Sequence, residues 1–188
     1  MRDISLHLMD IVQNSIRAQA KLIHIRMDLT DKGMLTLVVK DDGTGMAPEL
    51  KNRVQDPFAT TRNSRKVGLG LPLYTQNARR TGGDVTVQSE PGKGTAVTAV
   101  FHTGHIDCLP MGDVAETILA LVIACPETPD FVFYLTAPGG EASLDTRTVR
   151  EALQDVPLNE PEVITWLKLT LQEEIQQAFG GTENEIHR

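Results

Sequence analysis

Residues 22–29 alternate between apolar and polar side chains without interruption, and this alternation constrains the fold more than any other feature of the sequence. A period of two residues is typical of a β-strand that buries one face and exposes the other. Asp31-Lys32-Gly33 follows as a tight turn, and residues 34–40 are predicted to form the returning strand. The chain is therefore expected to build a sheet around this hairpin, with one face half-buried.

Helical and strand patterns continue on both sides of the hairpin. The first helix is predicted because Ile4, Leu8 and Ile11 recur at three- and four-residue spacing, and Asp3 is suited to cap its start. The predicted helices are 4–19, 70–81, 113–124, 146–153 and 161–179. The further predicted strands are 84–89, 95–101 and 131–136. About twenty residues after Met46 show little regular pattern.

The net charge of −7 hides two halves of opposite sign. Residues 1–103 carry 14 Lys and Arg against 10 Asp and Glu, whereas residues 104–188 carry 4 against 15. A length of 188 residues suits one full domain plus an appendage. We therefore expect a basic domain at 1–103, which suits a bound polyanion, and an acidic α/β appendage at 104–188.

Composition also narrows the compartment and the partners. The longest apolar run, residues 118–125, is too short to span a bilayer, and the N-terminus lacks the pattern of a secretory signal. Two distant cysteines provide no disulfide framework, so a cytoplasmic location is expected. The acidic half argues against nucleic acid as a partner of the whole chain, and no membrane partner is expected.

The first helix carries a carboxylate and an amide on one face. Asp10 and Asn14 are four residues apart, which places one above the other on a helix. An amide oxygen is a suitable ligand for Mg²⁺, and a carboxylate one turn earlier can orient or deprotonate an attacking group. The alternative for this spacing alone is a polar stripe that faces solvent.

A second polar segment follows the returning strand directly. Asp41, at the end of that strand, can accept a hydrogen bond from an exocyclic amine such as that of adenine. Gly43 and Gly45 allow the backbone to approach a flat ring closely. The alternative for this string alone is an ordinary Asp-Gly turn.

A third segment opens the helix predicted at 70–81. Gly68 and Gly70 flank its first turn, where backbone N–H groups can bind phosphate oxygens. Arg62 and Lys66 lie just upstream and add positive charge. A helix that opens on two glycines is weak evidence by itself.

Together and in this order, these segments resemble the GHKL ATPase superfamily of histidine kinases, gyrase-type topoisomerases, heat-shock chaperones, MutL proteins and anti-sigma kinases. The resemblance covers residues 4–102. Asp56-Pro-Phe-Ala-Thr-Thr-Arg62 and Gly68-Leu-Gly-Leu-Pro72 look most like the histidine-kinase lid, and residues 89–95 are similar to the end of that domain. The resemblance implies an α+β fold, a two-layer α/β sandwich whose mixed sheet is backed by helices. It also implies bound ATP under a lid at about 47–67, followed by a mostly helical C-terminal appendage.

The resemblance also implies roles for individual residues. Asn14 would bind Mg²⁺, Asp41 would read the adenine amine, and Asp10 stands where hydrolysing members place a glutamate base. The residues implied to contact ATP are Asn14, Asp41, Gly43, Gly45, Met46, Phe58, Thr60, Thr61, Arg62, Lys66, Gly68, Leu69, Gly70 and Thr95. Two positions depart from the family pattern, because Asp10 is shorter than glutamate and Lys66 replaces a lid glycine.

By this resemblance the protein is expected to be an ATP- and Mg²⁺-dependent protein kinase of histidine-kinase type, or a weak ATPase, that acts in signal transduction. Only 13 residues precede Asn14, so its phosphoacceptor is expected on another chain. One alternative is a nucleotide-driven switch that gates a partner protein. Another is an anti-sigma-type serine kinase in which Asp10 accepts the hydroxyl proton. For residues 104–188, packing on the ATP domain, a homodimer interface and partner binding are all left open.

Overall fold

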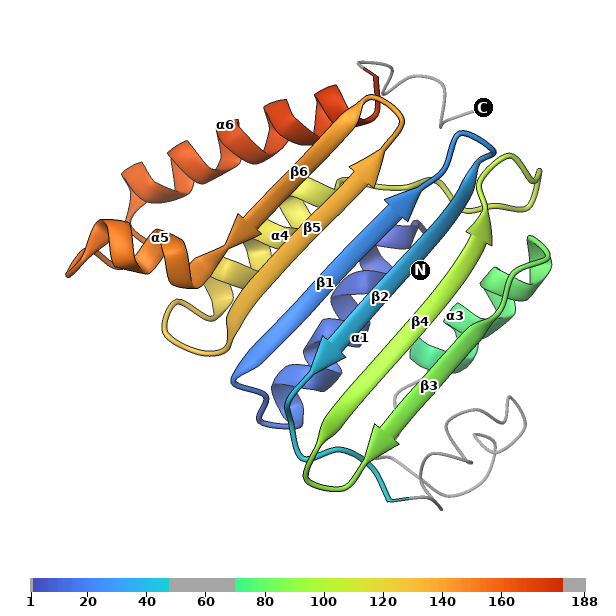
Figure 1. Ribbon diagram of the computed structural model, residues 1–188, viewed down its shortest axis with the longest axis horizontal. Coiled ribbons are helices and arrows are strands. Elements are labelled where there is room, and N and C mark those ends of the chain that lie inside the picture. The colour runs from blue at the N-terminus through green and yellow to red at the C-terminus, as the bar shows by residue number, and fades with distance from the viewer. Residues whose placement is uncertain (1, 48–69, 181–188) are drawn as a thin grey trace.

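The computed structural model describes residues 2–47 and 70–180 and shows a sheet with helices packed on one face (Figure 1). The strands are β1 (Leu22–Leu29), β2 (Met34–Asp41), β3 (Val85–Glu90), β4 (Gly94–His102), β5 (Asp130–Ala137) and β6 (Gly140–Asp145). The helices are α1 (Ile4–Arg17), α3 (Gly70–Arg80), α4 (Val114–Ala124), α5 (Thr146–Leu153) and α6 (Pro161–Ala178). The expected α+β fold with a mixed sheet is therefore confirmed.

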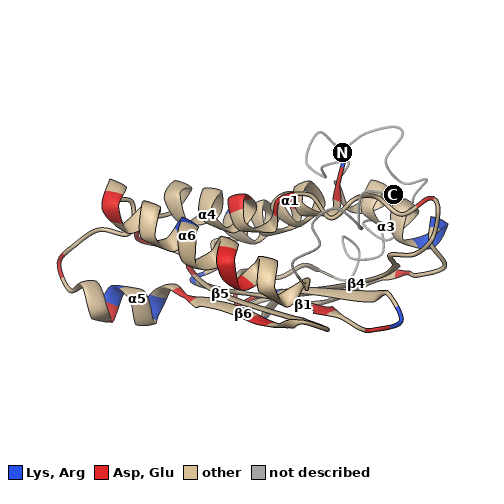
Figure 2. Ribbon diagram, turned by 90° about the horizontal axis from the view of Figure 1, so that it is seen from above, with Lys and Arg blue, Asp and Glu red and all other residues tan. Residues whose placement is uncertain are grey.

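The six strands lie in the order β3-β4-β2-β1-β5-β6. All neighbouring pairs are antiparallel except β1 and β5, which run parallel. Helices α1, α3, α4 and α6 lie side by side above one face of this sheet, as the view from above shows (Figure 2). The core fills the space between these two layers, where Leu8 of α1, Tyr74 of α3 and Phe133 of β5 are fully buried.

The alternation in residues 22–29 produces the expected half-buried strand. Ile23, Ile25 and Met27 face the helices and are at most 1% exposed. Arg26 lies on the other face, where it pairs with Asp28 at 2.7 Å and stacks over the ring of Tyr134. The pattern thus sets which face of the sheet the helices cover.

The two C-terminal strands continue the N-terminal sheet. β5 pairs with β1 from Leu22 to Asp28, and β6 pairs with β5 as the outer strand. The predicted division at residue 103 stays a prediction, and the sheet is continuous across it. Within the described residues each predicted helix and strand is present, with its ends within two residues of those expected. β6 was not predicted, because residues 138–140 were expected to be a loop.

The start of α1 joins the two halves of the chain. The backbone N–H groups of Ile4 and Ser5 donate to the carbonyl oxygens of Pro110 and Met111, both at 2.9 Å. Asp3 caps the helix as expected, because its Oδ1 accepts the N–H of Leu6 at 2.8 Å. These three bonds satisfy donors that a helix leaves without partners inside its own first turn.

A buried histidine lies where α1 packs on α3. His7 is fully buried, its Nε2 accepts the side-chain amide of Asn77 at 2.9 Å, and its ring lies 4.9 Å from that of Tyr74. Tyr74 in turn contacts the ring of Phe101, at 5.3 Å. Burial lowers the pKa of His7 to about 4, against the opposing charge of Asp3. His7 is therefore a neutral member of the core near pH 7.

We expect His7 to make folding sensitive to mild acid. Below a pH of about 6.5 the unfolded chain binds a proton that the folded chain refuses until its own pKa of about 4, so stability falls as pH falls through this window. The loss is on the order of 2 kcal/mol. Urea titrations between pH 7 and pH 4 should show a shallower decline for His7→Gln. His24→Gln, an exposed control on β1, should follow the wild type, and equal slopes for all three proteins would contradict the assignment.

Candidate nucleotide-binding site

Asp41, the last residue of β2, is a buried carboxylate with three hydrogen bonds and an exposed fraction of only 6%. Its Oδ2 accepts the hydroxyl of Ser15, on α1, at 2.6 Å. Its Oδ1 accepts the backbone N–H groups of Gly43 at 2.9 Å and of Thr95 at 3.1 Å. A carboxylate has about four acceptor positions, so Asp41 keeps the capacity to accept one further N–H group.

The neighbouring carboxylate has a different role. Asp42 Oδ1 accepts the backbone N–H groups of Lys21 at 2.7 Å and Leu22 at 3.0 Å, at the start of β1. Partial burial opposes ionisation, but these two N–H groups outweigh it and lower the pKa of Asp42. Asp42 therefore ties two strand ends together, while Asp41 is the better candidate to bind a ligand.

Glycines after Asp41 let three backbone segments meet closely. A side chain at Gly43 would place its Cβ 2.7 Å from the carbonyl oxygen of Ala18, at the end of α1. A Cβ at Gly45 would lie 2.0 Å from the carbonyl oxygen of Glu90, where the backbone also has a φ of +65°. Packing of the chain against itself is thus sufficient to require both glycines, and their predicted contact with a purine stays a prediction.

Thr95 and Met46 meet at one serine. The Ser89 hydroxyl lies 2.9 Å from Thr95 Oγ1, and its oxygen accepts the backbone N–H of Met46 at 2.8 Å. Thr95 is also the direct cross-strand partner of Asp41 in the β2–β4 pair. Three predicted residues, Asp41, Thr95 and Met46, are therefore linked at one end of the sheet.

We expect Gly94→Ala to damage this end of the sheet far more than Gly92→Ala. Both residues have positive φ, but a Cβ at Gly94 would lie 2.0 Å from the carbonyl oxygen of Asp41, whereas one at Gly92 has no atom within 4 Å. Gly92→Ala should cost about 1 kcal/mol for its backbone conformation alone. Gly94→Ala should lower the free energy of unfolding by more than about 3 kcal/mol. Equal urea midpoints for the two variants would contradict this geometry.

The polar face of α1 lies beside the start of α3. Asp10 is half-buried, and a Cβ at Gly70 would lie 3.0 Å from its Oδ2, so the carboxylate packs directly against the first residue of α3. Asn14, one turn further along α1, is exposed, and its Oδ1 accepts a long hydrogen bond from Arg17 at 3.3 Å. An exposed amide oxygen with one weak partner is a donor that suits a hydrated Mg²⁺ ion.

Several predicted contacts cannot be placed. These are Phe58, Thr60, Thr61, Arg62, Lys66, Gly68 and Leu69, which lie outside the described residues together with the predicted lid after Ala47. Two partners of the site were missed, namely Ser15 and Ser89. Ser15 carried a weak signal, because it is a small polar residue on the otherwise apolar face of the first helix.

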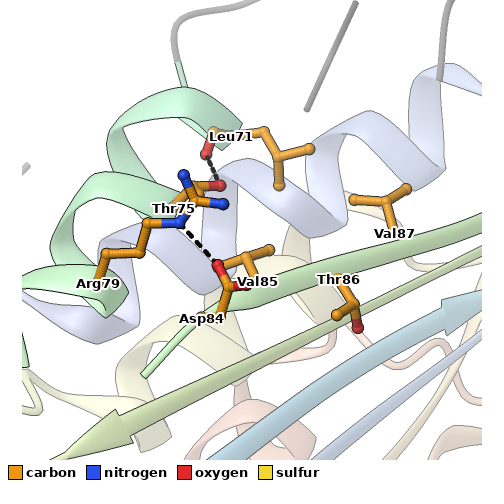
Figure 3. A pocket seen from close by; sticks show the side chains of 7 residues that line it. All are labelled: Leu71, Thr75, Arg79, Asp84, Val85, Thr86 and Val87. Carbon is orange, nitrogen blue, oxygen red and sulfur yellow. Dashed lines mark hydrogen bonds and ion pairs between the residues drawn. The ribbon is translucent and has the colours of Figure 1, made fainter. Parts of the chain in front are cut away.

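A hollow of about 230 Å³ lies between α3 and β3, beside this region (Figure 3). Its polar rim is an ion pair between Arg79 and Asp84 at 2.8 Å. The N–H of Val85 and the Arg79 guanidinium together lower the pKa of Asp84. None of the predicted ATP contacts lines the hollow, and Arg79 is already neutralised, so this hollow is not the candidate nucleotide site.

Comparison with known proteins identifies the family of the N-terminal part. The family described as "Histidine kinase-, DNA gyrase B-, and HSP90-like ATPase" matches residues 2–105. A putative sensor protein of Shewanella frigidimarina is 34% identical over 104 residues, 53% of this chain and 16% of that protein. The sensor kinase CckA of Brucella abortus is 36% identical over 84 residues, 44% of this chain and 9% of that protein. Sporulation kinase E of Bacillus subtilis is 35% identical over 80 residues, 43% of this chain and 10% of that protein.

Solved structures give looser matches. Full-length ShkA in complex with AMPPNP is 25% identical, with a TM-score of 0.41 over 50% of this chain and 20% of that one. The N-terminal domain of a DNA repair protein is 14% identical, with a TM-score of 0.49 over 97% of this chain and 58% of that one. No helix in the described ranges is long and apolar enough to cross a membrane.

The chain spans less than a fifth of the length of these three sensor and sporulation proteins. The family match nevertheless covers more than half of the chain, and it includes α1, the β1–β2 hairpin and the strand pair that holds Thr95. The chain therefore belongs to the histidine kinase-, DNA gyrase B- and HSP90-like ATPase family, with an ATP-binding domain of histidine-kinase type.

Proposed function

We propose that this protein binds ATP with Mg²⁺ and supplies phosphotransfer of histidine-kinase type to an acceptor on another chain, as a cytoplasmic signalling component. The observation that carries the proposal is Asp41, a buried carboxylate held by three donors with room for one more. The exocyclic amine of adenine is a donor of the required kind. Both cysteines are free thiols, which is compatible with a reducing compartment.

The residues of α1 take the phosphate side of the proposed site. Asn14 would hold Mg²⁺ through its exposed amide oxygen, and Mg²⁺ when bound neutralises part of the phosphate charge. Asp10, packed against the start of α3, is placed at the helix terminus that suits phosphate. A histidine acceptor attacks through its neutral ring nitrogen and needs no strong base, whereas for a serine or threonine acceptor Asp10 would take the hydroxyl proton.

A nucleotide-driven switch is the second candidate, and the contacts of α1 favour it. This helix donates Ser15 to Asp41 at one end, and at the other it is bonded to Pro110 and Met111 of the C-terminal half. A shift of α1 on nucleotide binding would therefore be transmitted to residues 104–188. Such a switch requires a partner to bind the nucleotide-bound and nucleotide-free states with different affinity.

The experiment that tests the proposal has two readouts. Calorimetric titration with a non-hydrolysable ATP analogue and Mg²⁺ measures binding, and incubation with γ-labelled ATP and candidate response proteins measures transfer. A label that is lost in acid and kept in alkali indicates phosphohistidine, whereas phosphoserine has the opposite stability. Binding without transfer, together with a nucleotide-dependent partner affinity, would favour the switch. Absence of binding would overturn both candidates.

A further inference from the structure

Two large apolar side chains lie exposed on α6, far from the candidate nucleotide site (Figure 1). Trp166 is 53% exposed and Leu169 is 63% exposed, and Trp166 is the single tryptophan of the chain. The buried face of α6 is made by other residues, namely Val163, Leu167, Leu171, Ile175 and Ala178. Trp166 and Leu169 are therefore not needed for the packing of α6 on the sheet.

Acidic side chains bracket this pair along the helix. Glu162, Trp166, Leu169 and Glu173 follow one another at spacings of four, three and four residues, so they form one stripe, here called the Trp166 stripe. Glu162 and Glu173 are both exposed. Figure 2 looks onto α6 and shows its acidic positions in red. The stripe thus presents an apolar centre with a carboxylate at each end.

The nearby charges do not neutralise these carboxylates. Lys168 is the one basic residue of α6, and it pairs with Glu116 of α4, across the boundary between the two helices. On the side of β6, Glu174 accepts the backbone N–H of Ser143 at 3.1 Å and so covers the outer edge of the sheet. Among the described residues, no ion pair involves Glu162 or Glu173.

We propose that the Trp166 stripe is a docking surface for a basic amphipathic helix of a partner protein. Such a helix would lay apolar residues at three- and four-residue spacing on Trp166 and Leu169, and its Lys or Arg residues would reach Glu162 and Glu173. An exposed tryptophan is a frequent anchor of protein interfaces. Because the two carboxylates flank the apolar pair, they select partners by charge.

The same charges disfavour the other occupants. A second copy of this chain would bring Glu162 and Glu173 against the same residues of its partner, and like charges in an interface are repulsive. Anionic lipid headgroups and nucleic-acid phosphates are repelled for the same reason. A basic helix is the occupant that satisfies both the apolar centre and the acidic ends.

Fluorescence of Trp166 tests the proposal directly, since the full chain has no other tryptophan. Two synthetic amphipathic peptides serve as probes, one of leucine and lysine and one of leucine and glutamate in the same pattern. The lysine peptide should shift the emission of Trp166 to shorter wavelength in a saturable manner, and the glutamate peptide should not. Equal responses to both peptides would overturn the proposal.

Charge reversal gives the matched comparison. Glu162→Lys with Glu173→Lys should weaken binding of the lysine peptide at least about tenfold and allow the glutamate peptide to bind. Asp31→Lys with Glu127→Lys makes the same change in net charge at exposed positions outside α6, and should leave both affinities unchanged. Equal losses in the two double variants would show unspecific attraction and overturn the proposal.

Removal of the apolar centre supplies a second variant that keeps the fluorophore. Leu169→Ser should weaken the lysine peptide about tenfold without a change in the urea midpoint, because Leu169 is mostly exposed. Sedimentation of the wild type measures self-association. A dimer that Leu169→Ser dissociates would assign the stripe to a second copy and overturn the assignment to a basic helix.

Discussion

Asp41→Asn is expected to reverse the preference of the nucleotide site between adenine and hypoxanthine. The asparagine oxygen can keep the N–H groups of Gly43 and Thr95, and the Ser15 hydroxyl can rotate to accept from the new amide. The remaining amide N–H is then a donor where the carboxylate was an acceptor. It opposes the amine of ATP and suits the carbonyl oxygen of ITP.

The measurement is the ratio of the dissociation constants for ATP and ITP, each with Mg²⁺. A donor facing a buried donor costs about 1–3 kcal/mol, so ATP affinity should fall roughly five- to 150-fold and the ratio should change at least about tenfold in favour of ITP. Asp42→Asn is the matched control, because its oxygen can still accept the N–H groups of Lys21 and Leu22. Equal effects of the two variants would remove Asp41 from the site.

Asp41→Ala is a less selective change than Asp41→Asn. It leaves the hydroxyl of Ser15 and the N–H groups of Gly43 and Thr95 without their acceptor in a buried position. Each unsatisfied donor costs about 1–3 kcal/mol, so loss of stability would mix with loss of binding. The asparagine variant separates the two because it keeps the acceptors that the backbone needs.

Most of the fold could be predicted because its signals are local. The alternation of residues 22–29 and the three- and four-residue spacing of Leu8 and Ile11 each report burial on one face of one element. β6 could not be predicted, because Gly140–Asp145 is an outer strand with only Ala142 and Leu144 buried, and two apolar residues are too few to show a period. The parallel pairing of β5 with β1 also has no local signal, since it joins segments about a hundred residues apart.

The site shows the same limit at the level of side chains. Asp41 was predictable from its position at the end of a strand, and the structure buries it there. Its partners Ser15 and Thr95 come from α1 and β4, so their arrangement depends on tertiary packing. Gly43 and Gly45 were assigned to ligand contact, yet the backbones of Ala18 and Glu90 already exclude a side chain at both positions. A glycine pattern thus reports close approach without naming what approaches.

The fragment 1–105, cut just after the family match, is expected not to fold stably by itself. β1 would become an outer strand along its whole length, with the N–H and C=O groups that now pair with β5 left unpaired. The hydroxyl of Thr136, which donates to Asp28 at 2.5 Å, would be removed with it. A long unpaired edge is a site of aggregation.

The cut also removes the cover of α1, the helix on which the nucleotide site depends. Ile4 and Ser5 would lose the carbonyl oxygens of Pro110 and Met111, and the face of α1 that packs on α4 would be exposed. These losses together exceed the usual 5–15 kcal/mol stability of a domain, so the fragment should lack a cooperative urea transition and bind no nucleotide. The fragment 1–180 keeps every described strand and helix and should match the full chain. Cooperative unfolding of 1–105 with full ATP affinity would instead establish residues 1–103 as an independent domain, and β5 would then be a strand added to a sheet that is already stable without it.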